Sequence, residues 1–282
     1  MTEISLPVTL AVLGAALLHA AWNALLKAGG DKQLVAMGVA AGSGVVALAA
    51  APFLPAPAAE SYPWIAASAL VHIAYFWALA GAYRWGDMTF SYPIMRGGGP
   101  LIVTVAGGAV FGETLGGGQL AGVLLISAGI LAFASHTAAD PAAQKKSLAF
   151  ALLNACVIAA YTLIDAKGAR LSGAPVSYAL WFFVANGAVI FAVACLQRGA
   201  AAPRHLVRHW RVPLLGGALA LGSYAVALWA MTRAPVALVA VLRETAVVFA
   251  AVLGALFLKE RFTPRRGAAT LAVLAGLAAL RI

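Results

Sequence analysis

A single stretch, residues 88–112 (MTFSYPIMRGGGPLIVTVAGGAVFG), limits what this chain can fold into. It is long enough to cross a bilayer, because about 20 apolar helical residues span the hydrocarbon core. It also carries Arg96 near its middle, and inserting an arginine there costs at least ~2.5–3.5 kcal/mol. Such a charge is tolerated where it faces protein or a watery cavity. The stretch therefore predicts a membrane-spanning helix whose Arg96 faces a cavity.

Helix-breaking residues lie on both sides of this arginine. They are Pro93, Gly97, Gly98, Gly99 and Pro100. Proline removes a backbone hydrogen bond from a helix, and kinks occur mainly where such residues interrupt the hydrogen-bond pattern. We expect these residues to form a hinge at which the helix is broken and bends during a functional cycle.

The stretch has a counterpart at 235–259, reached by adding 147 to each residue number. This shift places Arg96 on Arg243 and, just beyond the stretch, Glu113 on Glu260. Arginine and glutamate are scarce in this chain, so a match of both by chance is improbable. Matches between alanines, by contrast, are expected by chance. The sequence therefore predicts an internal repeat.

Composition places this repeat in a membrane. The 282 residues are 63% hydrophobic and 10% charged, whereas soluble domains are nearer half apolar and a quarter charged. Five spans in each half would make the halves, 1–139 and 140–282, an inverted repeat around a central cavity. The predicted fold is an all-α polytopic membrane protein with ten spans, at about 8–27, 33–54, 62–83, 88–112, 117–136, 147–166, 175–196, 212–232, 235–258 and 264–281.

The net charge of +10 does not indicate a nucleic-acid partner, because the basic residues lie in short loops between spans, where they face lipid headgroups. Thirteen of the 19 Lys and Arg lie in the odd-numbered loops. The positive-inside rule then predicts both termini outside the cytoplasm. A reporter fused after Ile282 that is active only in the cytoplasm would contradict this orientation.

Polar and aromatic residues recur at helical spacing on six spans, and polar faces of membrane helices turn inward. We expect them to line a substrate cavity. The alternative is a structural role, with the arginines bonded to carbonyls of a broken helix and the rings in packing. The candidate substrate-binding residues are Trp22, Asn23, His72, Tyr75, Tyr92, Arg96, Tyr161, Tyr224, Arg243 and Glu244.

Other polar residues are assigned structural roles. Asp165 and Lys167 fall near the end of a predicted span and are expected to be solvated. Glu113 and Glu260 lie at loop edges, where a capping or loop-fixing role is favoured over a role in transport. Small residues in the second, fifth and tenth spans favour close helix packing within one chain, with dimer contacts as the alternative. We therefore expect a monomer or a weak dimer.

Enzyme signatures are absent from the sequence, which has no HExxH, GxSxG, Walker or CxxC motif. Cys156 and Cys195 lie inside apolar spans and are expected to be packing residues. We expect no catalytic residue, no metal and no cofactor. An intramembrane enzyme and a channel are the less favoured alternatives.

The ends of the two repeated stretches are similar to a known family. Gly112-Glu113-Thr114-Leu115 and Lys259-Glu260-Arg261-Phe262-Thr263 are each followed by a span rich in Gly, Ala and Leu. The chain thereby resembles the drug/metabolite transporter superfamily, in its ten-helix form made of two EamA-type halves. The first half departs from the pattern, with Gly-Gly-Gly where the second has Thr-Pro-Arg. The resemblance implies alternating access without ATP and is closest to YddG-type amino-acid exporters.

The expected function is export of neutral and aromatic amino acids across a bacterial inner membrane. One arginine can bind the carboxylate of the substrate, and Glu244 or a backbone carbonyl can bind its amine. The aromatic residues can contact an apolar side chain. Sugar phosphates, nucleotide sugars and drugs remain alternative substrates. Whether transport is coupled to protons is left open, and Glu244 and His72 are the groups to test.

Overall fold

The computed structural model describes residues 4–28, 31–134, 140–257 and 264–280, and within them every regular element is a helix. Eight of the described helical segments are long and apolar enough to cross a membrane. Two further apolar helices, Gly117–Leu131 and Gly267–Ala279, are shorter. The predicted all-α polytopic membrane fold is confirmed.

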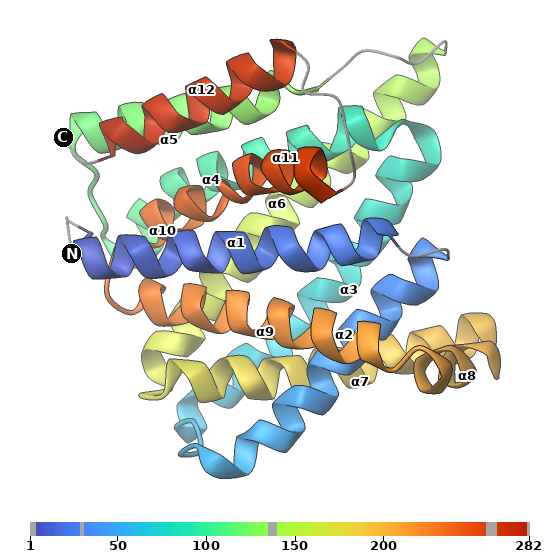
Figure 1. Cartoon of the computed structure of the whole chain (residues 1–282). Helices are drawn as coiled ribbons and strands as arrows, with labels where there is room; N and C mark the ends of the chain where they lie inside the picture. The colour runs from blue at the N-terminus through green and yellow to red at the C-terminus, as the bar shows by residue number, and fades with distance from the viewer. Residues whose placement is uncertain (1–3, 29–30, 135–139, 258–263, 281–282) are drawn as a thin grey trace.

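The helices correspond to the ten predicted spans, with differences that are described below (Figure 1). Glu260 falls outside the described residues, so its predicted role stays a prediction. The elements are α1 Leu6–Ala28, α2 Lys32–Ala50, η1 Ala51–Phe53, η2 Ala59–Ser61, α3 Tyr62–Trp85, α4 Met88–Phe111, α5 Gly117–Leu131, α6 Pro141–Leu171, α7 Pro175–Arg198, α8 Ala201–Arg208, α9 Arg211–Met231, α10 Val236–Arg243, α11 Ala246–Phe257 and α12 Pro264–Ala279.

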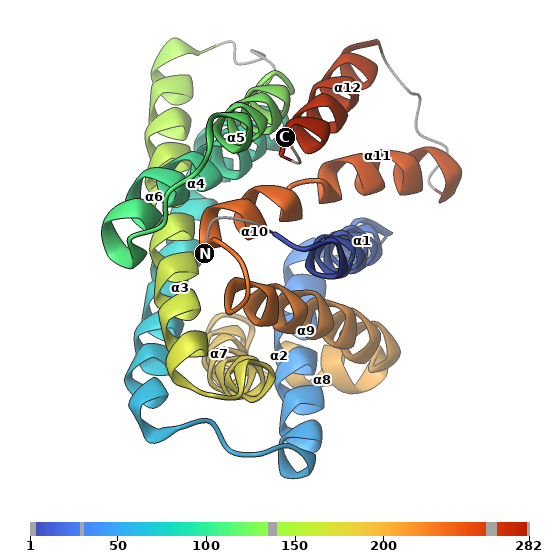
Figure 2. The same ribbon diagram turned by 90° about the vertical axis from the view of Figure 1, so that its left-hand side faces the viewer.

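The long helices run back and forth through one bundle, and the two ends of the chain lie at the same end of it (Figures 1 and 2). We call this end of the bundle the terminal end. The short helix α8 lies at the opposite end, between α7 and α9. It is an addition to the predicted spans and is rich in basic residues, which suits an interface with lipid headgroups.

Contacts between the two halves come in corresponding pairs. Helix α3 packs on α6 as α9 packs on α1, and α4 packs on α6 as α10 and α11 pack on α1. Two pairs, α2 with α7 and α5 with α12, are their own counterparts. Exchange of the halves therefore reproduces the contact pattern, as expected of a repeat related by a two-fold axis.

Small residues allow the closest of these contacts. A Cβ atom on Gly42 of α2 would overlap the Pro213 carbonyl of α9. A Cβ atom on Gly122 of α5 would lie 2.8 Å from the carbonyl oxygen of Gly276 in α12. These glycines are thus used for packing within the chain, which confirms the favoured interpretation of the small residues.

The break predicted in the fourth span is not seen, and its counterpart, the ninth span, is broken instead. Helix α4 is unbroken from Met88 to Phe111, although it contains Pro93 and Pro100. The ninth span is instead divided after Arg243, and α11 begins at Ala246. The prediction of a break in the fourth span was therefore wrong for this conformation.

Local hydrogen bonding explains the division. The amides of Glu244 and Thr245 bond to the carbonyls three residues earlier, at 3.0 and 3.1 Å, which tightens the helix into a 3₁₀ turn. The Thr245 hydroxyl also donates to the Leu242 carbonyl at 2.7 Å. Such a side chain competes with the backbone amide for a carbonyl and bends a helix without glycine or proline.

The glycine run in α4 serves close packing on two sides. A Cβ atom on Gly97 would lie 2.8 Å from Cγ of Leu131 in α5. On Gly98 and Gly99 it would lie 3.2 Å from Cβ of Ala155 and 3.0 Å from Cγ2 of Ile158, both in α6. Whether α4 also bends at this run during transport stays a prediction.

The variant Gly98→Ala tests that bending. A methyl group 3.2 Å from Ala155 is tight but can be accommodated by a small shift. If the run is a hinge, folded yield stays close to that of the wild type while turnover in vesicles falls. Gly14→Ala in α1 is the control, since its Cβ meets nothing within 4 Å. Equal losses of yield and turnover would make Gly98 a packing residue alone.

Candidate functional site

An ion pair joins the two halves in the middle of the bundle. Arg96 Nε of α4 lies 2.9 Å from Glu244 Oε2, just after α10, and the two side chains are only 12% and 7% exposed. The N–H is not aimed at the oxygen, since neither atom has a hydrogen-bond partner among the described residues. The pair is therefore held by charge, which is strong where water is excluded.

A small pocket with about 10 Å³ of free space lies beside this pair. Ligand pockets usually measure about 300–1,000 Å³, so the pocket is contracted in this conformation. Its wall combines the three charged residues with one aromatic ring and small or apolar groups from α4, α6 and α10. The lining residues are Arg96, Gly99, Pro100, Val103, Ile158, Tyr161, Thr162, Ala240, Arg243 and Glu244.

Among the described residues, Arg243 is the charged residue in this pocket that forms no ion pair. Its Nε atom is buried without a hydrogen-bond partner, and no carboxylate in the described ranges forms an ion pair with it. Its guanidinium carbon instead lies 5.0 Å from the centre of the Tyr224 ring in α9. A cation over a ring is attracted to its π face, which orients the guanidinium but leaves its N–H donors available.

Aromatic residues extend from the pocket toward α3 and α7. The Tyr161 ring lies 4.4 Å from the His72 ring and 6.0 Å from the Tyr75 ring. The His72 ring also lies 4.8 Å from the Phe182 ring. His72 Nδ1 is 2.8 Å from the Ser68 carbonyl, which can only accept, so Nδ1 carries the proton.

The structure thus brings Arg96, Tyr161, Arg243 and Glu244 together around the pocket. Tyr224, His72 and Tyr75 lie behind these residues, in contact with Arg243 or Tyr161. The remaining three candidates do not line the pocket. Tyr92 packs against the main apolar core, while Trp22 and Asn23 hydrogen-bond to His19 within α1.

Asp165 is a polar residue whose environment was predicted wrongly. It is fully buried and accepts hydrogen bonds from Tyr178 at 2.8 Å and Tyr224 at 2.5 Å. The expectation of a solvated carboxylate failed because α6 continues to Leu171, well past the predicted end of the span. Lys167, also predicted to be solvated, is half-buried.

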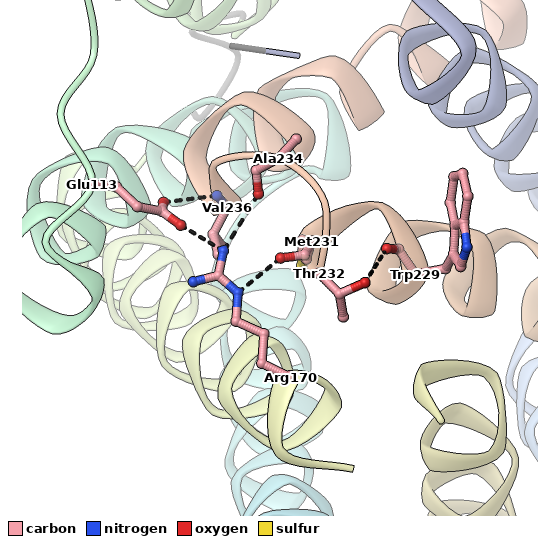
Figure 3. A network of polar contacts seen from close by, with 7 residues as sticks. All are labelled: Glu113, Arg170, Trp229, Met231, Thr232, Ala234 and Val236. Carbon is pink, nitrogen blue, oxygen red and sulfur yellow. Dashed lines mark hydrogen bonds and ion pairs between the residues drawn. The ribbon is translucent and has the colours of Figure 1, made fainter. Parts of the chain in front are cut away.

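A second polar cluster lies where α4, α6 and α9 end, at the terminal end of the bundle; its contacts are drawn in Figure 3. Arg170 NH2 lies 2.6 Å from Glu113 Oε1, and Arg170 Nε donates to the Met231 carbonyl at 2.9 Å. Glu113 Oε2 accepts from the Val236 amide at the start of α10, at 2.8 Å. We call this cluster, with the Ala234 carbonyl 3.4 Å from Arg170 NH2, the Glu113–Arg170 network.

This network joins the first half, through the loop after α4, to the end of α6 and the turn between α9 and α10. Glu113 therefore fixes loops, as the sequence predicted. The role of Arg170 was missed. The sequence feature that could have identified Arg170 is its place at the end of a span, as a basic residue on the same side of the membrane as Glu113.

Among the described residues, no group of three or more His, Cys, Asp or Glu could hold a metal ion. The fold and the pocket define a polytopic helical membrane protein with a small charged cavity between its two halves. The comparisons with known proteins name its class more closely. Residues 145–282 match the EamA-like transporter family.

Residues 145–282 are thus similar to this transporter family, and the match covers slightly less than half of the chain. No curated protein matches the chain. One solved crystal structure superposes with a TM-score of 0.72 over 96% of this chain and 94% of the other, at 18% identity. At that identity the likeness shows the fold alone.

Proposed function

We propose that this protein is a secondary transporter that exports neutral and aromatic amino acids by alternating access. The observation that carries the proposal is the unpaired Arg243 in a pocket that also holds Glu244 and an aromatic wall. A zwitterion can place its carboxylate on Arg243 and its ammonium near Glu244. Its side chain can then contact Tyr161 and Ile158, which are both buried.

Charge balance favours this substrate class over two others. Arg96 is paired with Glu244, so Arg243 is the pocket cation that remains available to a ligand. A phosphate ester carries about two negative charges and is held by clustered charge-assisted hydrogen bonds, which a single unmatched arginine does not supply. A cationic drug would meet this arginine as a like charge.

Alternating access is supported by a contact between the halves at one end of the bundle and by the small volume of the pocket. The Glu113–Arg170 network joins the halves at the terminal end, and the pocket is too contracted to admit a ligand without movement. We place the protein in a bacterial inner membrane, as a monomer or weak dimer. The use of its small-residue faces for internal packing supports the monomer.

The test is tolerance to a toxic amino-acid analogue, p-fluorophenylalanine, in cells that overproduce the protein. Wild type should raise tolerance, and Arg243→Ala should lower transport about tenfold to a hundredfold. The reason is that hydrogen bonds to charged groups contribute about 1.5–3 kcal/mol. Lys167→Ala, which lies outside the pocket lining, should keep the tolerance. No gain in tolerance, together with exchange of phosphate esters by vesicles, would overturn the proposal.

A further inference from the structure

A carboxylate without a cationic partner lies buried between α6, α7 and α9. Asp165 has no exposed surface, and no Lys, Arg or His in the described parts of the chain forms an ion pair with it. Its two oxygens instead accept from the hydroxyls of Tyr178 and Tyr224. Buried charges in membrane spans are costly and are usually paired, so a carboxylate held by neutral hydroxyls is unusual.

The groups that face this carboxylate come from each neighbouring helix. α7 supplies Tyr178 and α9 supplies Tyr224, while α3 places the Ser68 hydroxyl close to the carboxylate. From α10, the charge of Arg243 acts on it from behind the Tyr224 ring. His72 lies one turn after Ser68 on α3, with its Nδ1–H turned to the Ser68 carbonyl. Arg96 of α4 is engaged by Glu244, and Glu60 of η2 is exposed.

Tyr224 connects this carboxylate to the pocket. Its hydroxyl donates to Asp165, and its ring lies under the guanidinium of Arg243. When Asp165 is ionised, the buried charges balance, because Arg96 and Arg243 face Glu244 and Asp165. When Asp165 is neutral, one positive charge is left in excess at the pocket, where low dielectric makes it effective.

We infer that Asp165 is a proton-binding site, coupled through Tyr224 to the anion-binding arginine of the pocket. A proton taken from the aqueous phase adds to one carboxylate oxygen of Asp165. The tyrosine hydroxyl on that oxygen then turns from donating to accepting. No other atom or electron is gained or lost. The negative charge of Asp165, which acted on Arg243, is thereby removed.

The sign of the coupling follows from this charge balance. Lower pH protonates Asp165, which strengthens binding of a substrate carboxylate at Arg243. By linkage, substrate binding in turn promotes uptake of a proton. Both statements about the substrate rest on the proposed function, whereas proton binding at Asp165 does not.

The proton site can be tested without substrate by infrared difference spectroscopy of the purified protein between about pH 5 and about pH 9, a range that lies above the ordinary titration of an exposed Asp. We expect a protonated carboxyl C=O band that grows as pH falls and is missing in Asp165→Asn. Asp87→Asn, an exposed carboxylate before α4, should keep the band. A spectrum identical in wild type and Asp165→Asn would overturn the inference.

Tyr178→Phe provides a second variant in case Asp165→Asn does not fold. It keeps the carboxylate and removes one hydroxyl that stabilises the ionised form. The band should therefore appear at higher pH than in the wild type. A band that does not move would contradict the assignment to Asp165.

The coupling is tested with L-phenylalanine as the probe. Wild type should bind it at least about fivefold more tightly at about pH 5 than at about pH 8, within the usual range of coupling between two sites. Asp165→Asn should bind equally at both values, near the low-pH affinity. The same pH dependence in both proteins would overturn the coupling. If phenylalanine fails to bind while the infrared band titrates, the proposed function fails and the proton site stands.

Discussion

Arg170→Ala is expected to open the terminal end of the bundle and to slow transport by about tenfold or more. The guanidinium of Arg170 bonds to Glu113 of the first half and to the Met231 carbonyl of the second. Its loss leaves Glu113 with the Val236 amide as its remaining partner in the network. Hydrogen bonds to charged groups contribute about 1.5–3 kcal/mol, and every ~1.4 kcal/mol is a tenfold change in a conformational equilibrium.

The opening can be measured as a distance between spin labels on Thr114→Cys and Arg233→Cys. Both positions are exposed at the terminal end, one in each half, and the native Cys156 and Cys195 would be replaced by serine. Arg170→Ala should shift the distribution to longer distances. Arg208→Ala, an exposed arginine on α8 at the opposite end, is the matched control. An unchanged distribution with a normal transport rate would show that this network does not hold the end closed.

Single replacements of the Arg96–Glu244 pair should destabilise the protein, and the double replacement should restore most of the loss. Arg96→Gln or Glu244→Gln alone leaves a buried charge uncompensated, which costs about 3–5 kcal/mol. Replacing both partners removes the charges together, and such exchanges are often close to neutral. All three variants should be impaired in transport, because both side chains line the pocket.

Thermal unfolding of the detergent-solubilised protein provides the measurement, as a double-mutant cycle. The control is the ion pair of Arg198 and Asp31, whose atoms are 3.8 Å apart and whose side chains are 38% and 42% exposed. An exposed pair is worth about 0–1 kcal/mol, so Arg198→Gln should change stability little. If the two single losses at Arg96 and Glu244 simply add in the double variant, the pair is not a coupled unit.

The sequence could predict the repeat and the meeting of its two arginine stretches. Arg96 and Arg243 both line the pocket, because a charge in an apolar span has to face inward wherever the helices are placed. For the same reason Glu244 could be expected at the cavity. The ion-pair partner of Glu244 could not be predicted, because it belongs to the other half of the chain. Which residue lies opposite Glu244 depends on how α4 and α10 pack.

The division of the ninth span shows where sequence signals mislead. Glycine and proline are the usual signs of a break, yet α4 contains both and is unbroken. Its glycines are packed closely against α5 and α6, which hold the helix in place. The break lies instead at Arg243, Glu244 and Thr245, where a 3₁₀ turn and the Thr245 hydroxyl compete with the regular hydrogen bonds. Which of the two stretches is divided therefore depends on the residues packed against it.

Hydropathy and charge placement alone determined that this chain is a polytopic helical membrane protein with charged residues turned inward, because the bilayer penalises exposed charge and unpaired backbone groups. The tertiary structure decided which polar groups meet. Asp165 is bonded to two tyrosines from other helices, and Glu113 to an arginine 57 residues further along the chain. These contacts join segments that are distant in sequence, and each depends on a packing geometry that no local pattern encodes.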